Sequence, residues 1–230
     1  MIGIIAAMKE ELESLLPRMT GVEKTVISGV EYAEGELEGR RVVAAVCGVG
    51  KVFAALCAQT MILRFAPERI VNLGVGGTMC PGLGVLDTAI SDGVLQYDMD
   101  SSAVGDPVGL ISGINIITLP ADEMMAALLA DCVAKRGGKA LRGVIASGDR
   151  FVASAEEKER IRALFPEVIA VEMEGGGVGQ VCYVNRVPFA LLRTISDGDG
   201  GSMDYFAFKI KACEASIAVL LDFLKRADEL

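Results

Sequence analysis

Short apolar runs alternate with amphipathic stretches along this chain, and that alternation constrains the fold more than any other feature. The expected strands are residues 2–7, 42–46, 69–73, 85–94, 113–118, 141–147, 167–173 and 188–195. The expected helices are residues 9–19, 52–65, 122–136, 154–165, 176–185 and 204–226. Strands that alternate with helices are typical of α/β layer folds, so we predict an α/β protein.

Two neighbouring runs, residues 26–30 and 31–36, have the pattern of an antiparallel hairpin. A hairpin added to strands that helices connect makes the expected sheet mixed. The 230 residues contain no linker, low-complexity segment or internal repeat. We therefore expect residues 1–230 to form a single domain.

The composition excludes several classes of function. The net charge is −9, and the basic residues are scattered, which argues against a nucleic-acid partner. No apolar run reaches the roughly 18–20 residues that a membrane span needs, and the start of the chain lacks the pattern of a signal peptide. Six widely spaced cysteines without a CxxC pair favour free thiols in a reducing cytoplasm.

The chain contains no histidine. This excludes catalytic triads that use histidine and all histidine metal motifs, and we expect no metal and no cofactor. Acid–base chemistry must therefore fall to Asp, Glu, Lys, Tyr or Cys side chains.

Two acidic clusters follow two strand-like runs in residues 170–199. Glu172 and Glu174 end the first run, whereas Asp197 and Asp199 follow the second. The second run also contains Arg193, which must be paired or functional because an unpaired buried charge is very costly. Carboxylates at strand ends of an α/β sheet are where such folds usually bind ligands.

The first predicted helix, residues 9–19, has one apolar face, and Glu11 lies on the flank of that face. Glu11 is therefore the glutamate most easily drawn inward at the end of the first strand. The alternative is that it only stabilises the N-terminus of the helix.

Glycine turns follow two strands, at residues 46–52 and 73–79. Such turns let the backbone approach a ligand closely, but neither turn matches a Rossmann or P-loop fingerprint. A third turn, SGDRF, ends in Phe151, which could stack on a planar ligand or fill the core.

With these segments assembled, the chain resembles the 5′-methylthioadenosine/S-adenosylhomocysteine nucleosidase family of the purine nucleoside phosphorylase superfamily. The resemblance rests on IGIIAAMKEE, GVGKV, VNLGVGG, SGDRF, VEMEGGG and VPFALLRTISD. It implies a three-layer phosphorylase/hydrolase-like fold with a central mixed sheet flanked by helices, and a homodimer. It also implies hydrolysis of the bond between adenine and a 5′-thio-substituted ribose.

The resemblance also implies roles for individual residues. Asp197 would protonate adenine N7 with help from Ser196, and Glu11 would activate a water molecule that Arg193 helps to hold. The expected substrate contacts are Glu174 and Met173 at the ribose, Phe151 and the Val152 backbone at adenine, Val49, Met8 and Met203 at the ribose and 5′ group, and Gly77 in the second glycine turn.

Three positions depart from the family pattern. Val75 stands where the family usually has a serine, Met203 replaces a usual aromatic, and Val104 stands where the partner subunit often supplies an aromatic.

Three alternatives stay open. A phosphorylase of the same fold would need basic residues around phosphate, and Lys51 is the basic residue near the first two glycine turns. A hydrolase for another nucleoside, such as one of futalosine type, would differ in its 5′ pocket. A non-catalytic nucleoside-binding domain is the third alternative.

Overall fold

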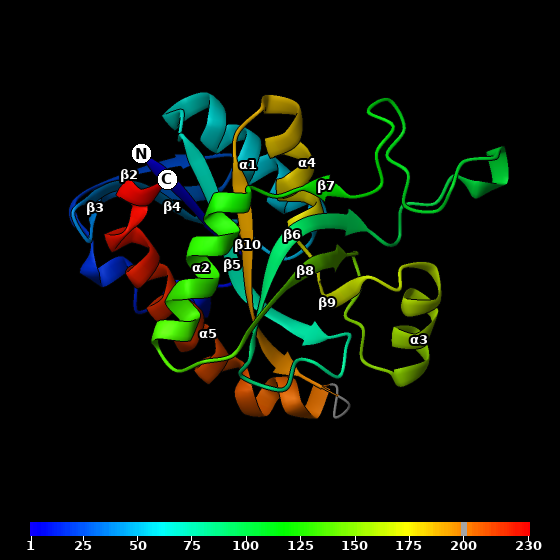
Figure 1. The fold of residues 1–230 in the computed structure, drawn as a ribbon. Helices are drawn as coiled ribbons and strands as arrows, with labels where there is room; N and C mark the ends of the chain where they lie inside the picture. The colour runs from blue at the N-terminus through cyan, green and yellow to red at the C-terminus, as the bar shows by residue number, and fades with distance from the viewer. Residues whose placement is uncertain (199–201) are drawn as a thin grey trace.

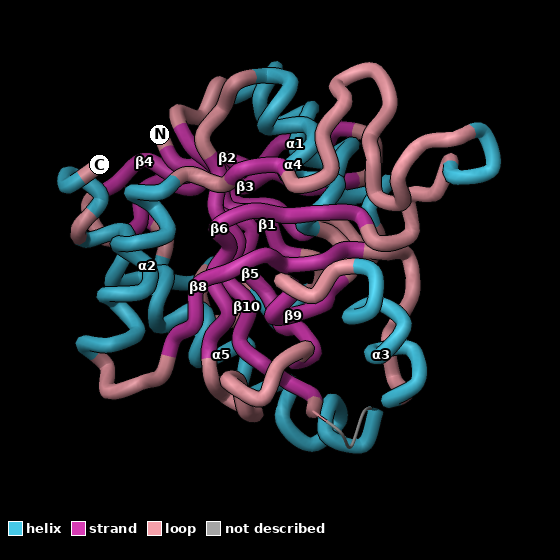
Figure 2. The backbone as a smooth tube through the Cα atoms, turned by 45° about the vertical axis from the view of Figure 1, so that its right-hand side comes forward, coloured by secondary structure: helices cyan, strands magenta, loops and turns pink. Residues whose placement is uncertain are grey.

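The computed structural model describes residues 1–198 and 202–230, so Asp199 lies outside the described residues. Within these residues, ten strands form one mixed sheet. Helices cover both of its faces, as Figures 1 and 2 show. The strands are β1 (Ile2–Ala6), β2 (Thr20–Ile27), β3 (Val30–Leu37), β4 (Arg40–Val46), β5 (Arg69–Thr78), β6 (Thr88–Gln96), β7 (Leu119–Pro120), β8 (Ala140–Ser147), β9 (Val168–Glu172) and β10 (Phe189–Asp197). The α-helices are α1 (Lys51–Phe65), α2 (Glu123–Lys135), α3 (Ala155–Leu164), α4 (Gly175–Asn185) and α5 (Ser202–Lys225). The prediction of a mixed α/β fold flanked by helices is confirmed.

Part of the sheet closes on itself. The strand order is β10-β6-β8-β9-β5-β1-β4-β3-β2, and β10 also pairs with β5. Strand β1 pairs in parallel with β4 and β5, and β10 pairs in parallel with β5. The carboxyl ends of these four strands therefore meet at one edge of the sheet. This curvature brings together strand ends that lie far apart in the sequence.

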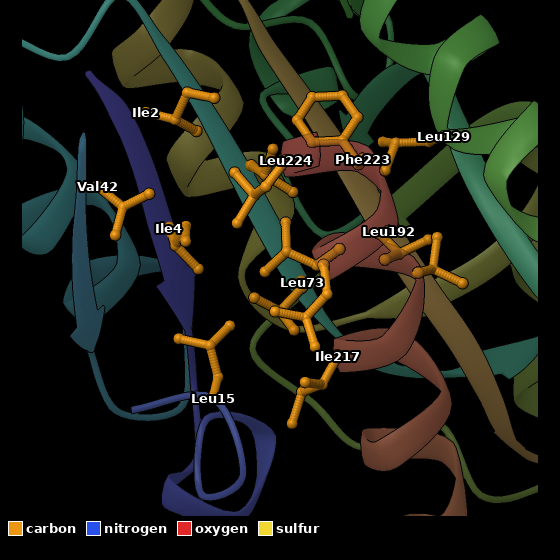
Figure 3. Packing of buried hydrophobic residues seen from close by; sticks show 14 of the residues in the cluster. Ile2, Ile4, Leu15, Val42, Leu73, Leu129, Leu192, Ile217, Phe223 and Leu224 are labelled. Atoms are coloured by element: carbon orange, nitrogen blue, oxygen red, sulfur yellow. The ribbon is translucent and has the colours of Figure 1, made fainter. Parts of the chain in front are cut away.

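Both faces of the sheet are buried. On one face α2 and α5 cover a cluster that includes Ile4, Leu73, Leu192 and Phe223, as Figure 3 shows. On the other face α1 and α4 pack together over a second cluster, to which Ile5 belongs. Because successive strand residues point to opposite faces, strands buried on both sides read as continuous apolar runs.

Glycines at the start of α4 allow it to pack closely. A Cβ atom on Gly175 would lie 2.0 Å from a Leu191 methyl group, and one on Gly177 would lie 2.5 Å from the Lys51 carbonyl oxygen. Any larger residue would push α4 away from β10 and α1. Close packing of α4 against its neighbours therefore explains the glycines of the VEMEGGG segment.

The predicted helix at residues 9–19 is wrong. Two short 3₁₀ helices, Lys9–Glu11 and Leu16–Arg18, stand in its place. Pro17 has no N–H to donate and disfavours a helical residue before it, so a continuous α-helix is not stable here. The apolar stripe is nevertheless correct, because Leu12 and Leu15 are fully buried.

The predicted strand at residues 113–118 is also wrong. These residues belong to the long connection between β6 and β7, which projects from the body of the molecule (Figures 1 and 2). The segment turns back on itself through a bridge between Ile111 and Ile116, with Gly113 and Asn115 at positive φ. An apolar run can form such a turn because local periodicity does not distinguish it from a strand.

The hairpin is confirmed but its turn is displaced. The strands β2 and β3 are joined at Ser28 and Gly29, which have φ angles of 51° and 79°. Two residues with positive φ form the tight turn whose twist matches that of the strands.

In the described residues, none of the helices has both the length and the apolar character needed to cross a membrane.

Candidate active site

A cavity of about 190 Å³ opens at the edge where the carboxyl ends of the strands meet. Its walls come from the residues after β1, β4 and β8, from the second half of β5, from the ends of β9 and β10, and from the start of α5. Most of the predicted site residues line it: Glu11, Asp197, Ser196, Glu174, Met173, Phe151, Val152, Val49, Met8 and Gly77. Arg193 and Met203 do not.

Glu11 is held by backbone N–H groups from the residues after β1 and from within β5. Its Oε2 accepts hydrogen bonds from Ala7 N at 2.8 Å and Met8 N at 2.9 Å, and its Oε1 accepts one from Val75 N at 3.1 Å. Burial raises the pKa of Glu11, whereas these N–H groups and the Arg193 charge oppose that increase. A Cβ atom at Gly74 would lie 2.6 Å from Oε1, so the carboxylate requires glycine there.

Asp197 stands at the end of β10 and is 2% exposed. Its Oδ1 accepts a hydrogen bond from the Ser196 hydroxyl at 2.9 Å, while Oδ2 faces Gly77, where a Cβ atom would lie 2.7 Å away. Burial raises the pKa of Asp197, which the Ser196 hydroxyl and the Lys158 charge partly counteract. A carboxyl group in this environment can hold a proton that an ordinary aspartate would lose.

Glu174 lies between the first glycine turn and α4. Its Oε1 accepts a hydrogen bond from Gly50 N at 2.9 Å. Burial and the charge of Glu172 raise the pKa of Glu174 to about 8. Met173 lies beside it in the cavity wall, so a carboxyl group and a thioether face the same space.

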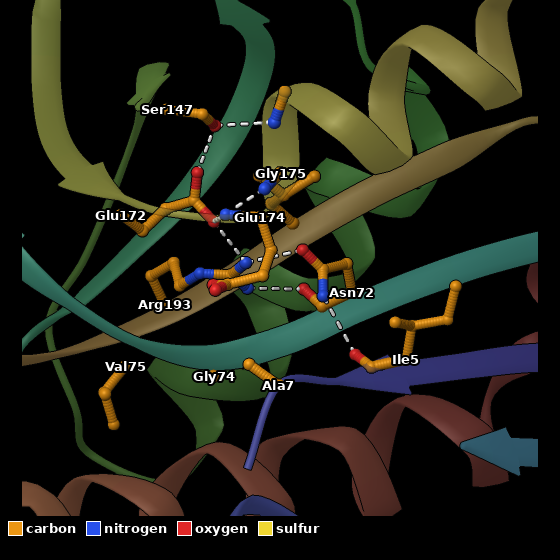
Figure 4. Close-up of polar contacts among 12 residues, drawn as sticks. Ile5, Ala7, Asn72, Gly74, Val75, Ser147, Glu172, Glu174, Gly175 and Arg193 are labelled. Atoms are coloured by element: carbon orange, nitrogen blue, oxygen red, sulfur yellow. Dashed lines mark hydrogen bonds and ion pairs between the residues drawn. The ribbon is translucent and has the colours of Figure 1, made fainter. Parts of the chain in front are cut away.

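Arg193 is paired and does not line the cavity. Its Nη2 lies 2.6 Å from Glu172 Oε2 and also donates to Asn72 Oδ1, while Nη1 donates to the Asn72 carbonyl at 2.9 Å (Figure 4). Its Nε has no hydrogen-bond partner in residues 1–198 and 202–230. The arginine in the apolar run is therefore the partner of a buried ion pair.

Glu172 links this ion pair to the site. Its Oε2 also accepts hydrogen bonds from Glu174 N at 3.0 Å and Gly175 N at 2.7 Å, and its Oε1 accepts one from the Ser147 hydroxyl (Figure 4). The network thereby joins β5, β8, β9, β10 and the start of α4. It fixes the backbone from which the Glu174 side chain enters the cavity.

One wall of the cavity is aromatic. The Phe151 ring contacts the Tyr205 ring edge-on, with centroids 5.4 Å apart, and the Tyr205 hydroxyl donates to Met8 Sδ at 3.4 Å. Met203, which we expected at the ribose and 5′ group, is 80% exposed and does not line the cavity. Tyr205 lies two residues further on, which is a different side of the same helix.

Sequence reasoning missed Tyr205, Arg150 and Asn72. Tyr205 could have been found, because it is an aromatic in the first turns of the final helix, close to the second acidic cluster. Asn72 lies within an apolar run and gave no signal, although its side chain is 1% exposed and its Nδ2 donates to the Ile5 carbonyl at 2.9 Å.

Comparisons with known proteins agree with this geometry. Residues 1–225 match the phosphorylase superfamily. A 5′-methylthioadenosine/S-adenosylhomocysteine nucleosidase of Geobacillus kaustophilus is 36% identical over 225 residues, which are 96% of this chain and 95% of the relative.

Two solved structures also resemble the chain. The nucleosidase of the same name from Neisseria meningitidis, in complex with methylthio-immucillin-A, superposes with a TM-score of 0.94 at 32% identity over 98% of both chains. A futalosine hydrolase of Helicobacter pylori gives a TM-score of 0.91 at 33% identity, covering 100% of this chain and 97% of that one. Sequence, fold and carboxylate-lined cavity together assign this chain to the 5′-methylthioadenosine/S-adenosylhomocysteine nucleosidase family of the phosphorylase superfamily.

Proposed function

We propose that this chain hydrolyses the N-glycosidic bond of 5′-methylthioadenosine and S-adenosylhomocysteine, releasing adenine and the 5′-thio-substituted ribose. The observation that carries the proposal is that Glu11 and Asp197, both buried, line one cavity from two different strand ends. Two carboxyl groups in different environments are the usual equipment for cleaving a glycosidic bond by direct attack of water.

Asp197 is the general acid. Adenine is a poor leaving group as an anion, so a proton on N7 lets it leave neutral. Burial raises the pKa of Asp197, which keeps the proton available, and the Ser196 hydroxyl at 2.9 Å orients the carboxyl group. Acid catalysis of this kind contributes roughly 10²–10⁴-fold to the rate.

Glu11 is the general base. As the bond to adenine breaks, the ribose acquires positive charge at C1′, and a carboxylate can activate water and stabilise that charge. The three N–H groups that bind Glu11 favour its ionised form, while burial raises its pKa and so makes it a stronger base. The Val75 side chain adds no hydrogen bond, so water positioning depends on Glu11 itself.

The remaining lining residues bind the substrate. Glu174 contacts the ribose hydroxyls, because its carboxyl group offers acceptors and, when protonated, a donor as well. Met173 packs beside the sugar, and Phe151 stacks on adenine, whose edge bonds to the Val152 backbone. Tyr205 takes the place at the 5′ group that sequence reasoning gave to Met203.

The lining charges argue against phosphorolysis. The described cavity is lined by four carboxyl groups, those of Glu11, Glu172, Glu174 and Asp197, and by one basic side chain, Arg150. Lys51 pairs with Asp98 and does not line the cavity. Inorganic phosphate would meet repulsion beside Glu11, whereas neutral water would not.

The test is adenine release from 5′-methylthioadenosine with and without phosphate. We expect release without phosphate, and a loss of about 10²–10⁴-fold in kcat for Asp197→Asn and Glu11→Gln. Glu10→Gln is the matched control, because Glu10 pairs with Lys209 outside the cavity. Release that requires phosphate would make the chain a phosphorylase, and release from futalosine alone would favour the alternative substrate.

We further infer a homodimer in the cytoplasm, built from one domain spanning residues 1–230. Several apolar side chains on α1 and α4 are exposed, which supports an interface with a second copy on this face. They are Val52, Phe53, Leu56 and Val184. The projecting connection between β6 and β7 (Figure 2) supports an arm that reaches a second copy. Sedimentation of the wild type and of Leu56→Glu tests the homodimer, since a monomeric wild type would refute it.

The free cysteines support a location in the reducing cytoplasm.

A further inference from the structure

Lys158 is a buried cation that the proposed chemistry does not use. It lies on α3, whose other charged residues are largely on the outside, yet Lys158 is 2% exposed. Burying an ammonium group is costly unless the group has a partner. Because α3 offers exposed positions on its other side, the burial of Lys158 indicates a specific interaction of its ammonium group.

The partner of Lys158 is the residue that follows Asp197. Lys158 Nζ donates a hydrogen bond of 2.7 Å to the Gly198 carbonyl oxygen. On the other side, Gly198 N donates to Asp204 Oδ2 at 3.1 Å, from the first turn of α5. Within residues 1–198 and 202–230, Lys158 forms no ion pair. Its charge is therefore directed at the Gly198 carbonyl oxygen, directly after Asp197.

We propose that Lys158 is a positioning residue for Asp197: its ammonium group fixes the Gly198 carbonyl and stabilises the carboxylate that Asp197 becomes in the reaction. The proposal rests on the proposed function. In that step the proton moves from Asp197 to adenine N7, and the electron pair of the C1′–N9 bond goes to adenine. Asp197 is left with a negative charge.

The charges around Asp197 agree with this role. Burial raises the pKa of Asp197 most strongly, the Ser196 hydroxyl and the Lys158 charge lower it, and Asp204 raises it. Lys158 thus favours the product of proton transfer, while burial and Asp204 favour the reactant. Loss of the cation should slow proton donation and shift ionisation of Asp197 to higher pH.

The experiment compares Lys158→Met, which removes the charge, with Lys158→Arg, which keeps it. We expect Lys158→Met to lower kcat with little change in KM, and to move the alkaline limb of the kcat profile upward by on the order of 0.5–1 pH unit. Lys158→Arg should keep the wild-type limb. Lys24→Met, on the exposed edge strand β2, is the matched control for the change in net charge.

Three outcomes would overturn the proposal. The first is a Lys158→Met enzyme with a lower Tm and lower activity but an unmoved pH profile, which means a purely structural role. The second is wild-type behaviour in every assay. The third is the same shift in Lys158→Arg as in Lys158→Met. If Lys158→Met does not fold, Lys158→Gln replaces it, since the amide can still donate to Gly198 without a charge.

A readout without substrate separates this proposal from the proposed function. The ionisation of Asp197 is followed by ¹³C NMR of labelled aspartate carboxyl groups, with Asp197→Asn to assign the signal. We expect the Asp197 titration to move to higher pH in Lys158→Met or Lys158→Gln but not in Lys158→Arg. An unmoved titration overturns the proposal even if the wild type releases adenine. A moved titration without adenine release would instead refute the proposed function.

Discussion

Replacement of Glu172 by glutamine should destabilise the fold strongly, because it leaves Arg193 buried without its counter-charge. Glu172 Oε2 and Arg193 Nη2 lie 2.6 Å apart, and both side chains are 1% exposed. Removing one partner of a buried ion pair costs about 3–5 kcal/mol. In a chain of this size, 1 kcal/mol changes the Tm by about 2–4 °C, so we expect a decrease of roughly 6–20 °C.

The control is an ion pair of the same residue types at nearly the same distance but in solvent. Arg142 Nη2 lies 2.7 Å from Glu123 Oε2, with side chains that are 27% and 78% exposed. Exposed pairs contribute little to stability because water already solvates both charges. Glu123→Gln should therefore leave the Tm almost unchanged. Both variants are measured by calorimetry at pH 7 and at equal protein concentration.

A second variant separates charge from packing. Glu172→Leu combined with Arg193→Met removes both charges and should be destabilised less than the sum of the two single substitutions. If Glu172→Gln unfolds at the wild-type temperature, the buried pair does not hold the sheet together and the reasoning fails. Because Glu172 also binds Glu174 N, activity should fall together with stability.

Three further predictions follow from the same geometry. Gly74→Ala puts a Cβ atom 2.6 Å from the carboxylate of Glu11 and should lower kcat by about 10²–10⁴-fold, whereas Gly84→Ala, with its nearest contact at 3.6 Å, should not. Tyr205→Phe keeps the aromatic wall and should leave KM for 5′-methylthioadenosine close to the wild-type value, while Tyr205→Ala should raise it. Burial and a neighbouring charge raise the pKa of Glu174 from 4.5 to about 8, so the protonated form is favoured by folding. Its contribution to stability is present below pH 4.5 and is lost as the pH rises through about 8. Thermal unfolding from pH 5 to 9 should show this loss in the wild type and a smaller one in Glu174→Gln; an equal loss in both would contradict the assignment.

The sequence alone determined the class of fold and indicated which carboxyl groups lie at the edge of the sheet. Apolar runs with strand and helix periodicity depend on neighbours a few residues away, so they can be read without the tertiary structure. The same holds for the carboxyl groups of Glu174 and Asp197, because the ends of apolar runs mark the edge of the sheet.

Only the tertiary structure decided which side chains meet. The sequence required Arg193 to be paired or functional, but its partners Glu172 and Asn72 come from other strands, far away in the sequence. Tyr205 lines the cavity, whereas Met203, two residues earlier on α5, is 80% exposed. The side chain of Lys158 meets the residue after Asp197 because α3 packs beside the end of β10. Such contacts arise from the closure of the sheet, and no local pattern encodes them.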